Sequence, residues 1–135
     1  MTRHEGERRT IASSISPDGR TLLVSSDRSV GYKNVAEIDV ATKNLTWVTD
    51  LEWEANSGDF SPDGKEFTYE VNEDGRIDTY LVDSATHRGS KINLGSGLNS
   101  YFGHPMQFAR QGGRLLVEHQ SSTQPSDLWV YDITR

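Results

Sequence analysis

The chain has 135 residues, no cysteine and a formal net charge of −6. Disulfides, thiolate metal sites and a cysteine nucleophile are therefore excluded, while the length suits one domain with a hydrophobic core. The acidic balance offers no electrostatic footprint for nucleic acid, and the sequence has no apolar run of the roughly 18 residues that a membrane-spanning helix needs.

The first nine residues are polar and carry charges of both signs. They lack the apolar stretch of a secretory signal, so we expect no signal peptide in this chain. A cysteine-free composition suits a cytoplasmic and a periplasmic protein equally well. The sequence therefore leaves the compartment open.

The first predicted unit, at about residues 10–50, contains two markers. Residues 16–19 read Ser-Pro-Asp-Gly, in which proline sets φ for the second turn position and glycine supplies a left-handed residue. We expect this turn to join two antiparallel strands. The second marker is Asp39, which ends a third strand and begins an Asp-x-x-Thr turn before a fourth strand over 44–49. The pattern predicts four short strands and no helix.

A second unit, at about residues 55–95, repeats both markers in phase. Ser-Pro-Asp-Gly recurs at 61–64, which is 45 residues after its first occurrence, and Asp83 follows Asp39 by 44 residues. A fourth strand is expected over 89–94. The acidic segment 72–75 lacks the spaced carboxylates and terminal glutamate of a calcium loop, so we interpret it as a tight turn.

A third unit, at about residues 104–134, is degenerate. Arg-Gln-Gly-Gly at 110–113 replaces Pro-Asp-Gly and its neighbour, so Gly112 takes the place of the turn glycine. Asp132 repeats the second marker near the end of the chain, and no segment is left for a fourth strand. Turn chemistry therefore assigns structural roles to ten residues: Pro17, Asp18, Gly19, Pro62, Asp63, Gly64, Gly112, Asp39, Asp83 and Asp132.

A period of about 45 residues is typical of one propeller blade of four strands. We therefore predict an all-β fold in one domain, 1–135: a partial β-propeller of about three antiparallel blades, the last lacking its fourth strand, with almost no helix. Strand alternation supports the alignment. The residues expected to share one face are Leu22, Val24, Phe67, Tyr69, Val71, Leu115 and Val117 on the second strands, and Ala36, Ile38, Tyr80, Val82, Trp129 and Tyr131 on the third strands.

Closed propellers typically have about four to eight blades. Three blades leave open sheet faces, which favour assembly with further protein surface. Two explanations remain open at this stage. The chain is an excerpt of a longer protein that supplies the remaining blades, or copies of it associate through their open blade faces.

No catalytic, metal or cofactor site is expected in the chain. Gly-Ser-Gly at 95–97 lacks the Gly-x-Ser-x-Gly spacing of a nucleophile elbow, and His119 with Ser121 and Ser122 lacks an orienting third group. The four histidines show no metal-ligand spacing. Three aromatic residues in connecting segments are instead candidates for a contact surface: Trp53, Tyr101 and Phe102.

The amino-acid sequence of the repeats resembles the WD-like repeats of TolB-type propellers. Ser-Pro-Asp-Gly followed by Arg or Lys, an apolar strand and an Asp-x-x-Thr turn carry the resemblance, which covers about residues 10–134. Leu-Trp-Val-Tyr-Asp at 128–132 is especially similar to the propeller domain of prolyl-oligopeptidase-family serine peptidases. In that family the propeller caps an α/β-hydrolase domain and restricts access to short or unstructured peptides.

This resemblance implies a non-catalytic, substrate-gating propeller segment. The catalytic serine, aspartate and histidine would lie in a hydrolase domain outside the chain, and the partners would be that domain, the remaining blades and a peptide substrate. The alternative is a TolB-like or WD-like scaffold that binds a protein partner. Neither alternative involves nucleic acid or a membrane.

Overall fold

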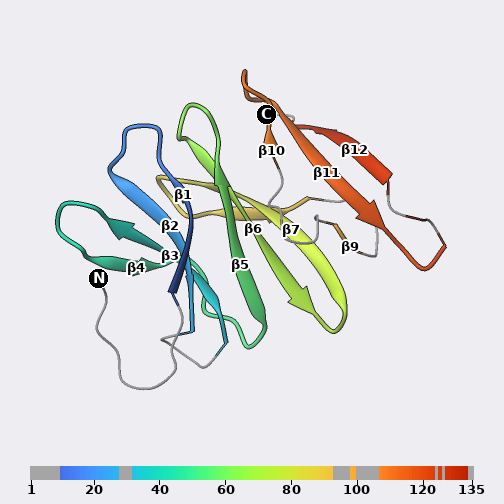
Figure 1. The fold of residues 1–135 in the computed structure, drawn as a ribbon, viewed down its shortest axis with the longest axis horizontal. Helices are drawn as coiled ribbons and strands as arrows, with labels where there is room; N and C mark the ends of the chain where they lie inside the picture. Colours follow the sequence, from blue (N-terminus) through green and yellow to red (C-terminus); the bar gives the residue numbers. More distant parts are fainter. Residues whose placement is uncertain are drawn as a thin grey trace.

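The computed structural model describes residues 10–27, 32–92, 107–123 and 127–133, with Pro125 and, for the backbone alone, 98–99. Within these ranges the chain forms twelve β-strands and no helix. The described part of the chain contains no helix that is long and apolar enough to cross a membrane. The strands form three groups that lie side by side in chain order, from blue to red in Figure 1. This is the all-β architecture that the repeats predict.

The first group of strands, blade 1, follows the chain in simple antiparallel order. Hydrogen bonds join β1 to β2, β2 to β3 and β3 to β4. The Ser-Pro-Asp-Gly turn connects the first two strands, as its turn chemistry predicts. The four strands are β1 (Thr10–Ile15), β2 (Thr21–Ser26), β3 (Asn34–Asp39) and β4 (Leu45–Trp47).

Blade 2 repeats this order one period later. Its third and second strands meet in a tight hairpin at Asp74 and Gly75, which both have positive φ angles, of 52° and 77°. Such a pair is typical of a type I′ turn, which suits the right-handed twist of a hairpin. The strands of blade 2 are β5 (Glu54–Phe60), β6 (Glu66–Glu73), β7 (Arg76–Asp83) and β8 (Gly89–Lys91).

Blade 3 contains β10 (Gln107–Phe108), β11 (Arg114–Gln120) and β12 (Asp127–Asp132). The strand β12 pairs with β11, and within the described ranges no further strand lies beyond it. A short strand that the repeats do not predict, β9 (Leu98–Asn99), pairs with β11 and also runs parallel to β7. Blades 2 and 3 therefore share one hydrogen-bonded network.

The sequence predicts fourth strands over 44–49 and 89–94. The strand β4 ends at Trp47, whereas β8 extends through Lys91 and residues 93 and 94 lie outside the described residues. The first of these stops because the backbone N–H groups of Val48 and Thr49 both donate to the carbonyl of Val35, at 2.8 and 3.2 Å. Two donors on one acceptor break the regular alternation of an antiparallel ladder.

Each blade has two faces, because successive side chains of a strand point to opposite sides. We call the face toward the next blade the leading face, and the face toward the preceding blade the trailing face. Leu23 and Val35 lie on the leading face of blade 1 and are fully buried. The residues predicted to share one face, such as Phe67 and Val82 in blade 2, are cross-strand partners on a trailing face. Both faces therefore contribute to the core.

Two apolar clusters join the blades. Between blades 1 and 2, Phe67 is fully buried and its ring meets that of Phe60 edge to face, with centroids 5.6 Å apart. Burial of one large apolar side chain contributes about 1.5–3 kcal/mol. The first cluster contains Leu23, Val35, Ala55, Phe60, Phe67, Val71 and Val82, and the second contains Ile92, Leu115 and Val117 with Leu81, Phe108, Tyr131 and Ile133 packed against them.

Polar contacts also connect blades 1 and 2. The hydroxyl of Ser25 accepts a hydrogen bond from the backbone N–H of Ser57 at 2.7 Å. The hydroxyl of Ser14 donates to the carboxylate of Asp59 at 2.6 Å. These bonds fix β5 beside the first two strands of blade 1. The register between blades is therefore set by hydrogen bonds as well as by apolar packing.

Candidate functional site

The two Ser-Pro-Asp-Gly turns have the same internal hydrogen bonds. In the first turn, the hydroxyl of Ser16 and the backbone N–H of Arg20 both donate to Oδ1 of Asp18. In the second, Ser61 and Lys65 donate to Asp63 in the same way. These bonds hold the pKa of Asp18 below its ordinary value, with the Ser16 hydroxyl as the largest cause. The structure therefore gives both aspartates an acceptor role within their own turn.

The third turn keeps this geometry without the serine and aspartate. Gly112 has φ of 72°, close to the 75° and 73° of the two earlier turn glycines, and its N–H donates to the carbonyl of Ala109 at 2.8 Å. Gly113 also has a positive φ, of 76°. Two glycines adopt this backbone without a Cβ penalty, so no side-chain acceptor is required.

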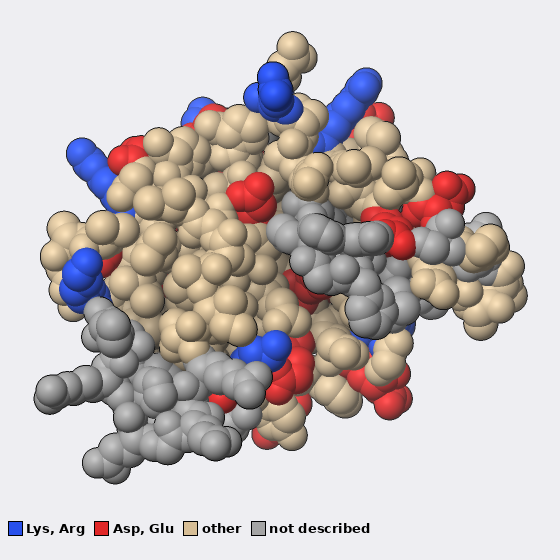
Figure 2. Space-filling model, viewed as in Figure 1, with Lys and Arg blue, Asp and Glu red and all other residues tan. Residues whose placement is uncertain are grey.

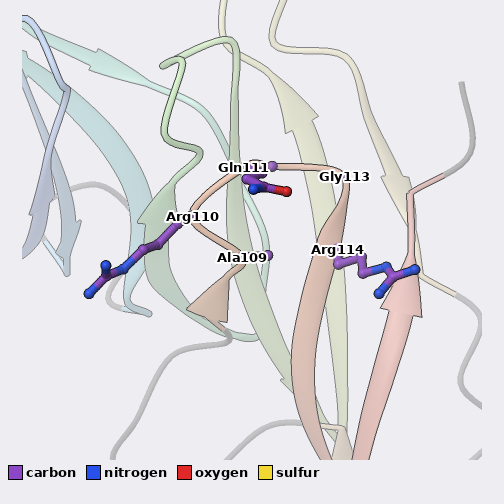
Figure 3. A pocket seen from close by; sticks show the side chains of 6 residues that line it. Ala109, Arg110, Gln111, Gly113 and Arg114 are labelled. Atoms are coloured by element: carbon purple, nitrogen blue, oxygen red, sulfur yellow. The ribbon is translucent and has the colours of Figure 1, made fainter.

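A shallow hollow beside the third turn is lined by residues 109–114. Figure 3 shows that the side chains of Arg110 and Arg114 leave the turn in opposite directions. The Arg114 guanidinium instead donates to Asp132, with 2.8 Å between Nε and Oδ1. Ligand sites need a few convergent polar groups, and these two arginines do not converge on the hollow.

The second marker begins a turn in each of the first two blades. Oδ1 of Asp83 accepts hydrogen bonds from the backbone N–H groups of Ala85 and Thr86, both at 2.9 Å. Asp39 accepts the equivalent two bonds in blade 1. The backbone N–H of Thr86 is the largest cause that lowers the pKa of Asp83 from its ordinary value of 3.8.

These lowered pKa values predict a pH-dependent stability. Because the folded state favours the charged form of Asp83, its contribution is present above the ordinary pKa and is lost as the pH falls through the folded value. Asn in Asp83→Asn keeps an oxygen acceptor but does not titrate. We expect the variant to be less stable than the wild type at neutral pH and to approach it below about pH 4. Thermal melts across this range measure the difference; a difference that stays constant with pH would contradict the assignment.

The candidate contact residues fall into two groups. Trp53 lies between the blades, just before β5, and is 41% exposed. In the described ranges no second aromatic ring packs against it, and its role in contacts stays a prediction. Tyr101 and Phe102 lie outside the described residues.

His119 and Ser122, which the sequence analysis considered as a catalytic pair, lie in different environments. His119 is buried on β11 and its ring stacks on Trp129, with centroids 4.3 Å apart. Ser122 is exposed in the connection that follows. A general base must reach its substrate, and a buried, stacked imidazole does not. Among the described residues, no group of three or more His, Cys, Asp or Glu side chains is placed to hold a metal ion.

Charged side chains are distributed rather than clustered. Figure 2 shows acidic and basic groups interspersed around one face of the molecule, with a broad uncharged area between them. Contacts between acidic and basic side chains span blades 1 and 2: Nε2 of His87 lies 3.1 Å from the carboxylate of Glu37, and Nζ of Lys33 lies 3.8 Å from the carboxylate of Glu54. These groups connect the two blades.

The most distinctive exposed surface is one that the sequence analysis did not single out. Leu116, Leu128 and Val130 of blade 3 are 40%, 65% and 64% exposed. They lie on the leading face, opposite the side of blade 3 that packs on blade 2. A signal was present in the run Leu-Trp-Val-Tyr at 128–131, which is apolar at every position and so predicts a strand covered on both faces.

Comparison with solved structures supports the architecture. TolB from Acinetobacter baumannii matches 89% of this chain with a TM-score of 0.72 and 21% identity, and a putative TolB from Agrobacterium tumefaciens matches 87% with 0.74 and 23%. Prolyl oligopeptidase B from Galerina marginata matches 98% with 0.72 and 12%. No protein-family model matches the chain. The fold is thus a partial β-propeller of the kind that the resemblance implies.

The chain is much shorter than these proteins. It spans 29% of the first TolB, 40% of the second and 18% of the oligopeptidase. At such identities the likeness establishes the fold and not the activity, because one fold carries many functions.

Proposed function

We propose that this chain is a non-catalytic segment of a propeller that limits access to the hydrolase domain of a prolyl-oligopeptidase-like serine peptidase. The observation that carries the proposal is the exposed apolar leading face of blade 3, which supports a position beside a further blade of a larger propeller. Its substrates would be peptides that can pass or enter such a ring. The catalytic groups and the remaining blades would be supplied from outside the chain.

Two further observations support this proposal. Asp39 and Asp83 accept backbone hydrogen bonds within their own turns, and the buried His119 stacks on Trp129, so contacts within the chain occupy these groups. In addition, the prolyl oligopeptidase that the chain resembles in fold was solved with a 35mer hydrolysis and macrocyclization substrate. A peptide-handling ring therefore provides a consistent setting for this segment.

A second candidate is a TolB-like scaffold that binds a protein partner. It is favoured by the exposed ring of Trp53, since tryptophan is enriched in the energetically dominant parts of protein interfaces. The two TolB structures also have higher identities to this chain than the oligopeptidase has. A Gly-x-Ser-x-Gly segment in the same reading frame as this chain would favour the peptidase. A reading frame that encodes further blades but no such segment would favour the scaffold.

The proposal predicts that the purified chain hydrolyses neither fluorogenic peptides nor nitrophenyl esters. Because His119 is buried against Trp129 and cannot reach a substrate in solution, any trace activity should disappear on repurification. Ser122→Ala provides the control, since Ser122 is the exposed serine that follows the buried histidine. Turnover that survives repurification and is lost in Ser122→Ala would contradict a non-catalytic role.

A further inference from the structure

The leading face of blade 3 is equivalent to a face that is already covered elsewhere in the chain. In blade 1, Leu23 pairs with Glu37 across the strands, and in blade 3 the equivalent pair is Leu116 with Val130. Blade 2 covers Leu23 completely, whereas Leu116 is 40% exposed. The same repeat position is therefore buried in blade 1, where blade 2 packs on it, and exposed in blade 3 of this chain.

Blade 3 is also more apolar at these positions than blade 1. Val130 stands where blade 1 has Glu37, and Leu128 stands where blade 1 has the fully buried Val35. A hollow of about 340 Å³ lies beside Leu116 and is lined mainly by β10 and β11. Clustered exposed apolar residues next to a hollow are typical of a surface that docks another protein element.

The trailing face of blade 1 is partly open: Val24 and Ala36 on this face are buried, while the row nearest the Ser-Pro-Asp-Gly turn is accessible. An apolar row crosses all four of its strands: Ile15 pairs with Leu22, Leu22 with Ile38 and Ile38 with Leu45. Ile15 is 53% exposed, and the other three are half-buried. In blade 2 the equivalent row begins Phe60, Phe67 and Val82, and blade 1 buries all three of these side chains.

We propose that two copies of this chain associate head to tail. The leading face of blade 3 in one copy covers the trailing face of blade 1 in the other, and the two-fold related contact closes the pair. The contact repeats the packing of blade 1 on blade 2, with Leu116 and Leu128 in the places of Leu23 and Val35. Two copies together provide about six blades, which lies within the usual size of a closed propeller.

This inference depends on the propeller fold and not on the peptidase assignment. Each copy carries a net charge of −6, so repulsion between copies opposes association, and added salt should strengthen it by screening. An association based on apolar blade faces differs in this respect from one based on ion pairs, which salt would weaken.

Sedimentation velocity across a wide range of concentrations tests the inference. Wild-type protein should change from monomer to dimer as the concentration rises. Leu128→Asp on the leading face and Ile15→Asp on the trailing face should each remain monomeric while still folded by circular dichroism. Ile11→Asp is the matched control: Ile11 is also on β1 and also 53% exposed, but it lies opposite Ser25, on the other face of blade 1. This control should associate like the wild type.

A mixture of the two monomeric variants separates head-to-tail association from other arrangements. Leu128→Asp retains an intact trailing face and Ile15→Asp retains an intact leading face, so one of the two contacts should form between them. Restored association of the mixture supports the proposal. A wild type that stays monomeric at every concentration would overturn it, and so would a mixture that fails to associate although the wild type does.

Discussion

Replacement of Leu23 by alanine should lower the free energy of unfolding by about 3 kcal/mol, within the range of about 2–5 kcal/mol for buried leucines. Leu23 is fully buried between blades 1 and 2, among the side chains of the first apolar cluster. Its truncation removes apolar contacts and leaves a cavity, because the neighbouring strands cannot move apart independently. Denaturation by urea at low protein concentration measures the loss.

Leu116→Ala is the matched control for this experiment. It truncates the same residue type at the equivalent repeat position, but 40% of Leu116 is exposed because no blade covers it. We expect a loss below about 1 kcal/mol. Equal losses for the two variants would show that blade 2 does not cover blade 1 as described.

Asn34→Ala should cost about 2–4 kcal/mol, because it leaves several buried polar groups without partners. The Asn34 side chain is fully buried and holds the connection from blade 1 to blade 2. Its Oδ1 accepts hydrogen bonds from the hydroxyl of Thr49 and the backbone N–H of Leu51, both at 2.8 Å, and its Nδ2 donates to the carbonyl of Leu51 at 3.1 Å. The same denaturation experiment measures this loss.

The control for Asn34 is Asn44→Ala in the exposed turn before β4. It makes the same chemical change at a residue whose side chain faces solvent, so we expect a change within about 0.5 kcal/mol. A small effect at Asn34 as well would mean that water or neighbouring groups satisfy the connection. The proposed role of Asn34 in joining the blades would then be wrong.

Much of the fold was predictable because its turns repeat with their chemistry intact. Ser-Pro-Asp-Gly specifies a tight hairpin through local hydrogen bonds, and Asp83 specifies the next turn in the same way. Local signals of this kind do not depend on the rest of the chain. They therefore predicted the order of strands and the all-β class directly from the residues.

Features set by contacts distant in sequence were not predictable. The pairing of β9 with both β7 and β11 depends on how two blades approach each other, and its two residues carry no strand signal. The early end of β4 depends on Val35, a residue of the neighbouring strand. Tertiary contacts of this kind override local propensity at strand ends.

The sequence predicted only some of the residues that the structure places on the candidate contact surfaces. Trp53 was named as a candidate contact residue in a connecting segment, and it is 41% exposed. Leu128 and Val130 were aligned as strand residues, but their exposure depends on which face of blade 3 has a neighbour. Repeat positions predict which residues lie on the face of a blade, and only the structure shows which of these faces is covered within this chain.

The central claim is that equivalent repeat positions are covered in blade 1 and open in blade 3. Since the chain has no cysteine, one introduced thiol at a time reports this directly. At low protein concentration, the thiol of Val35→Cys should resist a maleimide reagent until the protein unfolds, because Val35 is fully buried. The thiol of Leu128→Cys, at the equivalent position, should react readily in the folded protein. Equal reactivity of the two thiols in the folded state would contradict the account.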